Sequence, residues 1–144
     1  MLWPVAVMDF DTKVAVAVRD DLAAWQRVNV TAFLISGIAA AAGAEVIGED
    51  YLDADGNRYL PLLVQPVIVL EAAAAKLKTV RERAQRRGVP IALYTWEMFA
   101  TGHDAANREA VRAVPAEDLD IVGIALRAPH RDADAVLRGL GRHP

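Results

Sequence analysis

Lys13-Val-Ala-Val-Ala-Val18 decides the fold, because this unbroken apolar run is typical of a strand that is buried on both faces. The run ends at a polar turn that contains Arg19, Asp20 and Asp21. Residues 22–42 then form a long apolar segment with helical spacing, and Gly43 follows as the expected C-cap. A buried strand followed by an apolar helix predicts an α/β domain in which helices cover a sheet.

The rest of the chain continues this alternation. We expect further strands over 67–70, 91–95 and 120–127, and further helices over 72–87, 102–114 and 131–140. Between the first helix and the second strand, Asp53-Ala-Asp-Gly56 is a strong turn signal and predicts a small β-hairpin within residues 45–60. The aspartates there lack the later ligands and the closing Glu of a calcium loop, so the turn interpretation is favoured.

Length and composition limit the possible classes of protein. A chain of 144 residues with 54% hydrophobic residues has the size and content of one domain, 1–144. It contains no cysteine, which excludes disulfides and thiolate metal sites and fits a cytoplasmic location. The net charge of −3 makes nucleic-acid binding unlikely. The apolar start, residues 1–8, is too short for a signal core, and no segment is expected to approach a membrane span.

The first helix is apolar on two sides. One face carries Trp25, Val28, Ala32, Ile35 and Ala39, and another carries Val30, Leu34, Ile38 and Ala41. A helix of this kind must be buried on more than one side. This pattern motivates one of the functional alternatives, a non-catalytic protein that forms a homodimer or binds a partner.

The densest chemistry lies in Trp96–Arg108, directly after the strand over 91–95. Sites in α/β sheets usually lie in the loops that leave the central strands. Thr101 and Asp104 form a capping-box-like pair, which predicts Thr101 as the N-cap of the next helix. The amides of Gly102 and His103 would then point out of the positive end of the helix, where an anion can bind.

We therefore expect a small anionic ligand at this helix start, with Glu97 and His103 as a conceivable general acid–base pair. The residues expected to contact the ligand are Arg19, Asp21, Asn29, Thr101, Gly102, Asp104, Asn107 and Arg108. The plainer alternative is that Thr101 and Asp104 are only caps and that the remaining side chains face water. No metal and no cofactor are expected, because histidines at ligand spacing are absent and His143 lies in the tail.

Several segments together resemble a known superfamily. Lys13–Leu22, the Pro-Val-Ile-Val-Leu strand over 66–70, Ile91–Tyr94 and Ile121–Ala125 are similar in order to the type II peptidyl-tRNA hydrolase superfamily. Asn29–Phe33 and Met98–Arg108 resemble a bacterial branch of it that is described as domain of unknown function 2000. The resemblance implies a four-stranded mixed sheet with helices on both faces, and a homodimer.

The resemblance does not carry the hydrolase chemistry with it. The hydrolases follow their Arg-x-Asp-Leu motif with a Gly-Lys pair, a Gln and a His on the first helix, whereas this chain matches only Arg19, Asp21 and Leu22. The Asp-Ala-Gly turn of the hydrolases is replaced here by Trp96-Glu97-Met98. Loss of peptidyl-tRNA hydrolysis is therefore expected, and residual hydrolase activity is kept as an alternative.

Overall fold

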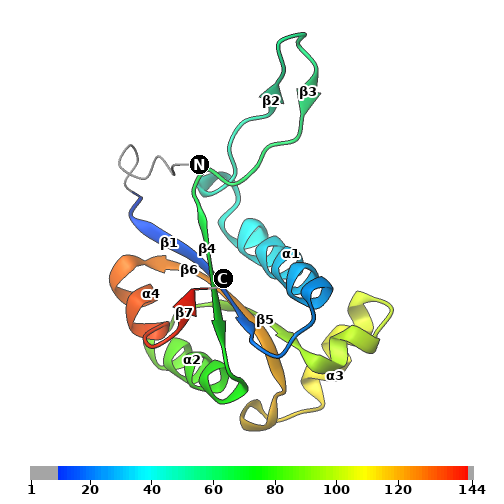
Figure 1. Cartoon of the computed structure of the whole chain (residues 1–144), viewed down its shortest axis with the longest axis vertical. Helices are drawn as coiled ribbons and strands as arrows, with labels where there is room; N and C mark the ends of the chain where they lie inside the picture. Colours follow the sequence, from blue (N-terminus) through cyan, green and yellow to red (C-terminus); the bar gives the residue numbers. More distant parts are fainter. Residues whose placement is uncertain (1–9, 143–144) are drawn as a thin grey trace.

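The computed structural model describes residues 10–142 (Figure 1). The apolar start over 1–8 and His143 lie outside this range, so the predictions made for them are not tested. The main sheet has five strands in the order β5-β6-β1-β4-β7. Their bounds are β1 Thr12–Arg19, β4 Val67–Ala72, β5 Ile91–Thr95, β6 Ile121–Pro129 and β7 Gly141–Arg142.

The loops that follow β1, β4 and β5 lie at the same end of the sheet. β1 pairs with β4 in parallel, whereas β6 is antiparallel to both β1 and β5. β1, β4 and β5 therefore run the same way, and the loops that follow them lie at the same edge of the sheet. This mixed α/β arrangement places the polar turn at Arg19 and the segment after Thr95 on one side of the molecule, as the sequence predicts.

The predicted count of four strands is wrong, because β7 adds a fifth. β7 has two residues, Gly141 and Arg142, which pair with Glu71 and Leu70 of β4. A two-residue strand is held by backbone hydrogen bonds alone and has no alternating side-chain pattern for sequence analysis to detect. The other four strands lie where they were predicted, within about two residues at each end.

Helices cover both faces of the sheet. α1 (Ala24–Ala42) lies on one face, and α2 (Ala74–Arg87) and α4 (His130–Val136) lie on the other (Figure 1). In β1 the valines at 14, 16 and 18 belong to the cluster under α1, while Ala15 and Ala17 belong to the cluster under α2. The alternation of valine and alanine in β1 thus places the valines in the hydrophobic core under α1 and the alanines in the core under α2.

α1 lies very close to the sheet at two glycines. A Cβ at Gly123 of β6 would lie 2.5 Å from Val30 Cγ1 and 2.9 Å from Leu34 Cδ1. A Cβ on Gly37 of α1 would lie 3.2 Å from Ala92 Cβ of β5. The absence of a side chain at these positions sets the distance between helix and sheet.

Among residues 10–142, only one side of α1 is buried. Val30, Leu34 and Ile38 are its buried residues, whereas Trp25 is 63% exposed and Val28 71% exposed. The expected burial of α1 on more than one side is therefore not supplied by residues 10–142, and burial of the second side by a partner stays a prediction. The segment Ala24–Glu45 is also long and apolar enough to cross a membrane, with a mean hydropathy of 1.4, contrary to the sequence-based expectation. Length and composition alone are weak evidence for a membrane span.

The hairpin predicted within residues 45–60 is present and projects from the body as an arm (Figure 1). β2 (Tyr51–Leu52) pairs with β3 (Arg58–Tyr59), and an isolated bridge between Ile47 and Leu63 closes its base. The Asp53 carboxylate accepts hydrogen bonds from the backbone amides of Asp55 and Asn57, from Asn57 Nδ2 and from Tyr59 Oη. These donors confirm a turn in which Asp53 organises the loop.

Short helices complete the edge of the sheet that holds the candidate site. The 3-10 helix η2 (Trp96–Ala100) follows β5, and α3 (Asp104–Arg112) follows η2. η3 (Ala116–Asp118) leads into β6, and η1 (Gly43–Glu45) follows α1. Gly43 and Gly88 end α1 and α2 with positive φ values, and Gly43 is the C-cap that the sequence predicts.

We predict that Gly123→Ala lowers the free energy of unfolding by about 1–3 kcal/mol, because the new methyl group overpacks the contact with Val30 and Leu34. Urea denaturation of the purified protein measures the loss. Gly102→Ala is the matched control, since nothing lies within 4 Å of its Cβ position. Equal stability of the two variants would contradict the close approach of α1 to β6.

The turn makes a second prediction. Hydrogen bonds from Asn57 and Tyr59 lower the pKa of Asp53 from 3.8 to about 2. A carboxyl with a lowered folded-state pKa stabilises the hairpin above its unfolded pKa, and that stabilisation is lost as the pH falls toward 2. We expect an NMR titration of the Asp53 carboxyl carbon to show a midpoint near this value. Tyr59→Phe should move the midpoint upward, and an ordinary midpoint in the unsubstituted chain would refute the network.

Candidate functional site

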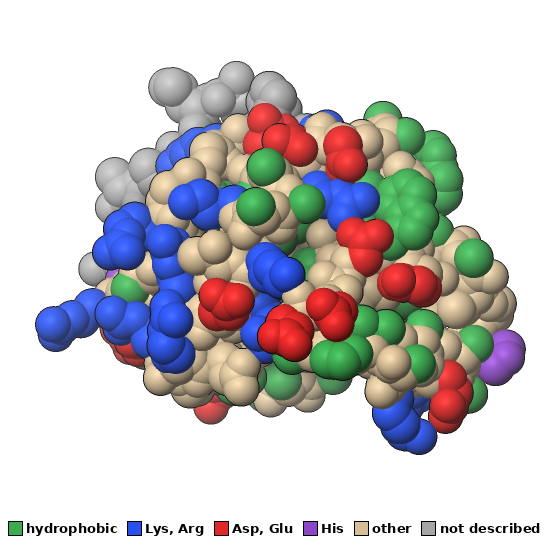
Figure 2. Space-filling view, turned by 90° about the horizontal axis from the view of Figure 1, so that it is seen from below, with side chains coloured by type: hydrophobic (Ala, Val, Ile, Leu, Met, Phe, Trp, Pro, Cys, Tyr) green, Lys and Arg blue, Asp and Glu red, His purple; other side chains and the backbone are tan. Residues whose placement is uncertain are grey.

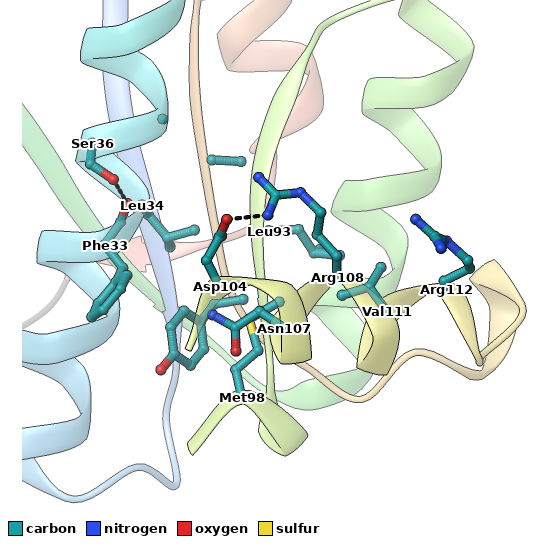
Figure 3. A pocket seen from close by; sticks show the side chains of 13 residues that line it. Phe33, Leu34, Ser36, Leu93, Met98, Asp104, Asn107, Arg108, Val111 and Arg112 are labelled. Carbon is teal, nitrogen blue, oxygen red and sulfur yellow. Dashed lines mark hydrogen bonds and ion pairs between the residues drawn. The ribbon is translucent and has the colours of Figure 1, made fainter. Parts of the chain in front are cut away.

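A groove of about 570 Å³ lies between α1 and α3 and extends along β5 (Figure 3). α1 contributes Phe33, Leu34, Ser36 and Gly37, and β5 contributes Ala92, Leu93 and Tyr94. Met98 of η2 and the α3 residues Asp104, Asn107, Arg108, Val111 and Arg112 complete the lining. Its volume is typical of pockets for small organic ligands.

The start of α3 differs from the prediction. His103, not Thr101, is the N-cap, and its Nδ1 accepts a hydrogen bond from the Ala106 amide at 3.2 Å. The sequence pattern favoured Thr101 because threonine is the commoner cap and Asp104 follows at capping-box spacing. His103 is exposed and does not line the groove, since its ring is used by the cap. Gly102 is also exposed and lies outside the lining.

Thr101 supports the corner between η2 and α3. Its hydroxyl donates to the Met98 carbonyl at 3.0 Å and also contacts Oδ1 of Asn107. Met98 and Asn107 both line the groove, so Thr101 acts on the groove wall indirectly. The structure thus brings Thr101 and Asn107 together, and the expected contact of both residues with a ligand stays a prediction.

The charges of α3 lie along one wall of the groove. Arg108 Nη1 bonds to the Asp104 carboxylate one turn earlier, and Figure 3 shows this pair facing the cavity. Arg112, which pairs with Glu109 at 3.2 Å, lies farther along α3. Asp104 stands in the first turn, where its negative charge suits the helix dipole and disfavours a second anion. An acidic group would therefore meet the guanidinium of Arg108 more readily than the helix amides.

Glu97 and His103 are not joined in the structure. Glu97 is an exposed residue of η2 outside the groove lining, and no hydrogen bond or ion pair links it to His103. The proposed acid–base pair therefore stays a prediction without geometric support.

Arg19 forms a second polar cluster, outside the groove. It is 7% exposed, and its guanidinium bonds to Asp21 at 2.7 Å, to Asp120 at 2.5 Å and to the Ile121 carbonyl at 3.4 Å. It also lies over the Trp96 ring, 5.4 Å from the centroid. Although burial opposes its charge, the two carboxylates raise the pKa of Arg19 overall. These contacts join the end of β1 to the start of β6, so Arg19 and Asp21 hold the sheet together at this edge.

Acidic, basic and hydrophobic side chains lie side by side at this end of the molecule (Figure 2). Asp120 belongs to the Arg19 cluster, and the sequence analysis did not identify it. Its position directly before a buried strand, like that of the turn after β1, was the available signal.

Asn29 does not line the groove itself but forms a hydrogen bond with Tyr94, which does. Its Nδ2 donates to Tyr94 Oη at 3.3 Å, and Tyr94 lines the groove. Burial raises the pKa of the Tyr94 phenol. The Tyr94 ring also contacts Phe33 and Phe99, with centroids 5.8 Å and 5.2 Å away. The sequence analysis missed Phe33, Tyr94 and Met98 as lining residues, because it searched for reactive groups and not for an apolar surface.

Within residues 10–142, no group of three or more His, Cys, Asp or Glu side chains is arranged to hold a metal ion.

The fold and the groove define a mixed α/β domain with a ligand-sized cleft between α1, β5 and α3. The chain belongs to the family described as Protein of unknown function (DUF2000), whose model matches residues 12–144. It is similar to a solved structure of a protein of unknown function from Agrobacterium tumefaciens str. C58, with 47% identity and a TM-score of 0.92. The similarity covers 94% of this chain and 100% of that one. No curated protein matches the chain.

We predict that Arg19→Gln lowers the free energy of unfolding by about 1–3 kcal/mol, because it removes charged hydrogen bonds from a nearly buried position. It should also change the tryptophan fluorescence, since Trp96 loses the guanidinium above its ring. Chemical denaturation followed by fluorescence measures both effects. Arg131→Gln, at an exposed position of α4, is the control, and an equally small effect of both variants would contradict a structural role for Arg19.

Proposed function

We propose that this protein binds a small organic molecule that combines an apolar body with an acidic group, in the groove between α1 and α3. The proposal rests on one observation, the two-sided chemistry of the groove. Leu34, Ala92 and Val111 offer apolar surface, whereas Asn107 and Arg108 offer polar groups along one wall. Ligand sites in proteins commonly combine an apolar surface with a few polar groups that orient the ligand.

Arg108 supplies the chemistry for the acidic group. A guanidinium carries five N–H donors in a planar fork that matches a carboxylate or a phosphate. The bond to Asp104 uses one nitrogen and lies on an exposed surface, where an ion pair is weak. An incoming acid therefore either binds N–H groups of Arg108 that Asp104 does not use or displaces Asp104, and in both cases it binds against the repulsion of the Asp104 carboxylate. This proposal moves the anion from the helix start, where it was first expected, to the side of α3.

The experiment is a thermal-shift screen of the full chain with pairs of related compounds, such as benzoate with benzamide and indole-3-acetate with its amide. We expect an acid from the panel to stabilise the protein by about 2.7 kcal/mol at a concentration one hundred times its dissociation constant, and its amide to have a much smaller effect. Arg108→Gln should abolish the effect of the acid, and Arg131→Gln should preserve it.

His103→Ala separates the two possible anion positions. It removes the α3 N-cap but no side chain of the groove lining, so stabilisation by the acid should survive if the circular dichroism spectrum of the variant is unchanged. Loss of the effect in His103→Ala together with its persistence in Arg108→Gln would assign the anion to the helix start. Absence of any stabilisation by the acids in the panel would refute the proposal.

We also propose that the fold is related to the type II peptidyl-tRNA hydrolases. The mixed sheet with helices on both faces and the matching Arg19, Asp21 and Leu22 support this relationship. Peptidyl-tRNA hydrolysis itself is not proposed, because the first helix carries no histidine. The cysteine-free composition supports a cytoplasmic location, and the Agrobacterium relative supports a bacterial origin.

A further inference from the structure

The outward face of α1 is apolar and uncovered within the described chain. We define this face by Trp25, Val28, Ala32, Ser36 and Ala40, all of which are exposed. None of these side chains is charged. The only charged residue of α1 is Arg27, and its Nη1 bonds to Glu71 Oε2 of β4 at 3.2 Å. An exposed helix face without charge over about four turns is unusual for a protein surface and is typical of an interface.

The size of the side chains changes along this face. Trp25 and Val28 are bulky and stand in the amino-terminal half, whereas Ser36 and Ala40 are small and stand in the carboxyl-terminal half. Ala32 lies between the two halves, four residues from both Val28 and Ser36. Four residues span about 6 Å along a helix. In an antiparallel pair of α1 helices centred on Ala32, each Val28 therefore meets the Ser36 of the other copy.

We propose that this face packs against the same face of a second copy of the chain, with the two α1 helices antiparallel and Ala32 at the two-fold axis. Such an interface is self-complementary, as two-fold symmetry requires, because bulky residues of each helix lie over small residues of the other. Trp25 of the second copy then lies over the segment around Ala40.

The area of the face agrees with a dissociable dimer. Trp25 and Val28 each leave more than 60% of their surface exposed, and Phe33 beside them leaves 55%. With the small residues, the face offers roughly 500 Å² for each copy, or roughly 1,000 Å² in total, which is the lower limit for a specific interface. The dimer should therefore dissociate on dilution.

The second copy also borders the ligand groove. Ser36 belongs both to the outward face and to the groove lining. The bulky half of the second α1 then forms an additional wall beside Ser36 and Gly37. Only this consequence depends on the proposed ligand, since the dimer itself rests on α1 alone.

Sedimentation velocity of the full chain without ligand tests the proposal over micromolar to millimolar concentrations. We expect a species of twice the 15.6 kDa chain mass at the higher concentrations. Ala32→Glu should raise the dissociation constant at least tenfold, because two carboxylates then meet at the axis. An equimolar mixture of Ala32→Glu and Ala32→Lys chains should restore the dimer. Ala75→Glu, at an exposed position of α2, is the control and should leave the dimer unchanged.

Cysteine cross-linking tests the register without a charge on the helix. The chain has no cysteine, so Ala32→Cys introduces a single thiol with little change in volume. Under oxidation we expect a covalent dimer from Ala32→Cys and none from Ala75→Cys. If the circular dichroism spectrum shows that Ala32→Glu does not fold, cross-linking of Ala32→Cys still tests whether Ala32 lies at the dimer axis.

Three results would overturn the proposal. The first is a monomer at every concentration, and the second is a dimer that survives Ala32→Glu in a folded chain. The third is a monomer that floats with vesicles of phosphatidylcholine and phosphatidylglycerol, which would assign the face to a membrane. An Arg108→Gln chain should remain dimeric, so loss of ligand binding and loss of dimerisation can be told apart.

Discussion

The close approach of α1 to β6 is the constraint on which the rest of the structure depends. Gly123 leaves no side chain between the strand and the helix, and Val30 and Leu34 occupy that space. Once this contact is fixed, the rotation of α1 about its axis is fixed too. Phe33 and Gly37 then form one wall of the groove, while Trp25 and Val28 face outward. One missing methyl group thus determines both the candidate ligand site and the candidate dimer surface.

Most of the fold could be predicted from the sequence because its signals are local. β1 is an unbroken run of valine and alanine, and α2 has a clear apolar stripe between polar residues and a glycine cap. Two features could not be predicted. β7 depends on backbone pairing alone, and the choice of the buried side of α1 depends on Gly123, which lies far away in the sequence. A helix that is apolar on two sides does not reveal which side the sheet will cover.

The candidate site could be predicted less well, because proximity in sequence does not give convergence in space. Trp96–Arg108 does carry one wall of the groove, through Met98, Asn107 and Arg108. His103 is used by the helix cap instead, and Arg19 is used at the junction of β1 and β6. Residue type alone does not separate a side chain that stabilises the backbone from one that faces a cavity. The apolar part of the groove comes from α1 and β5, which a search for reactive residues passes over.

The two walls of the groove differ in how strongly the fold constrains them. α1 is held to the sheet by Val30, Leu34 and Ile38, whereas none of the residues of α3 is buried. Substitutions on α3 therefore change the chemistry of the cavity without disturbing a hydrophobic core. For protein engineering, α3 is thus the wall that can be redesigned, because its side chains can be exchanged while α1 stays packed on the sheet.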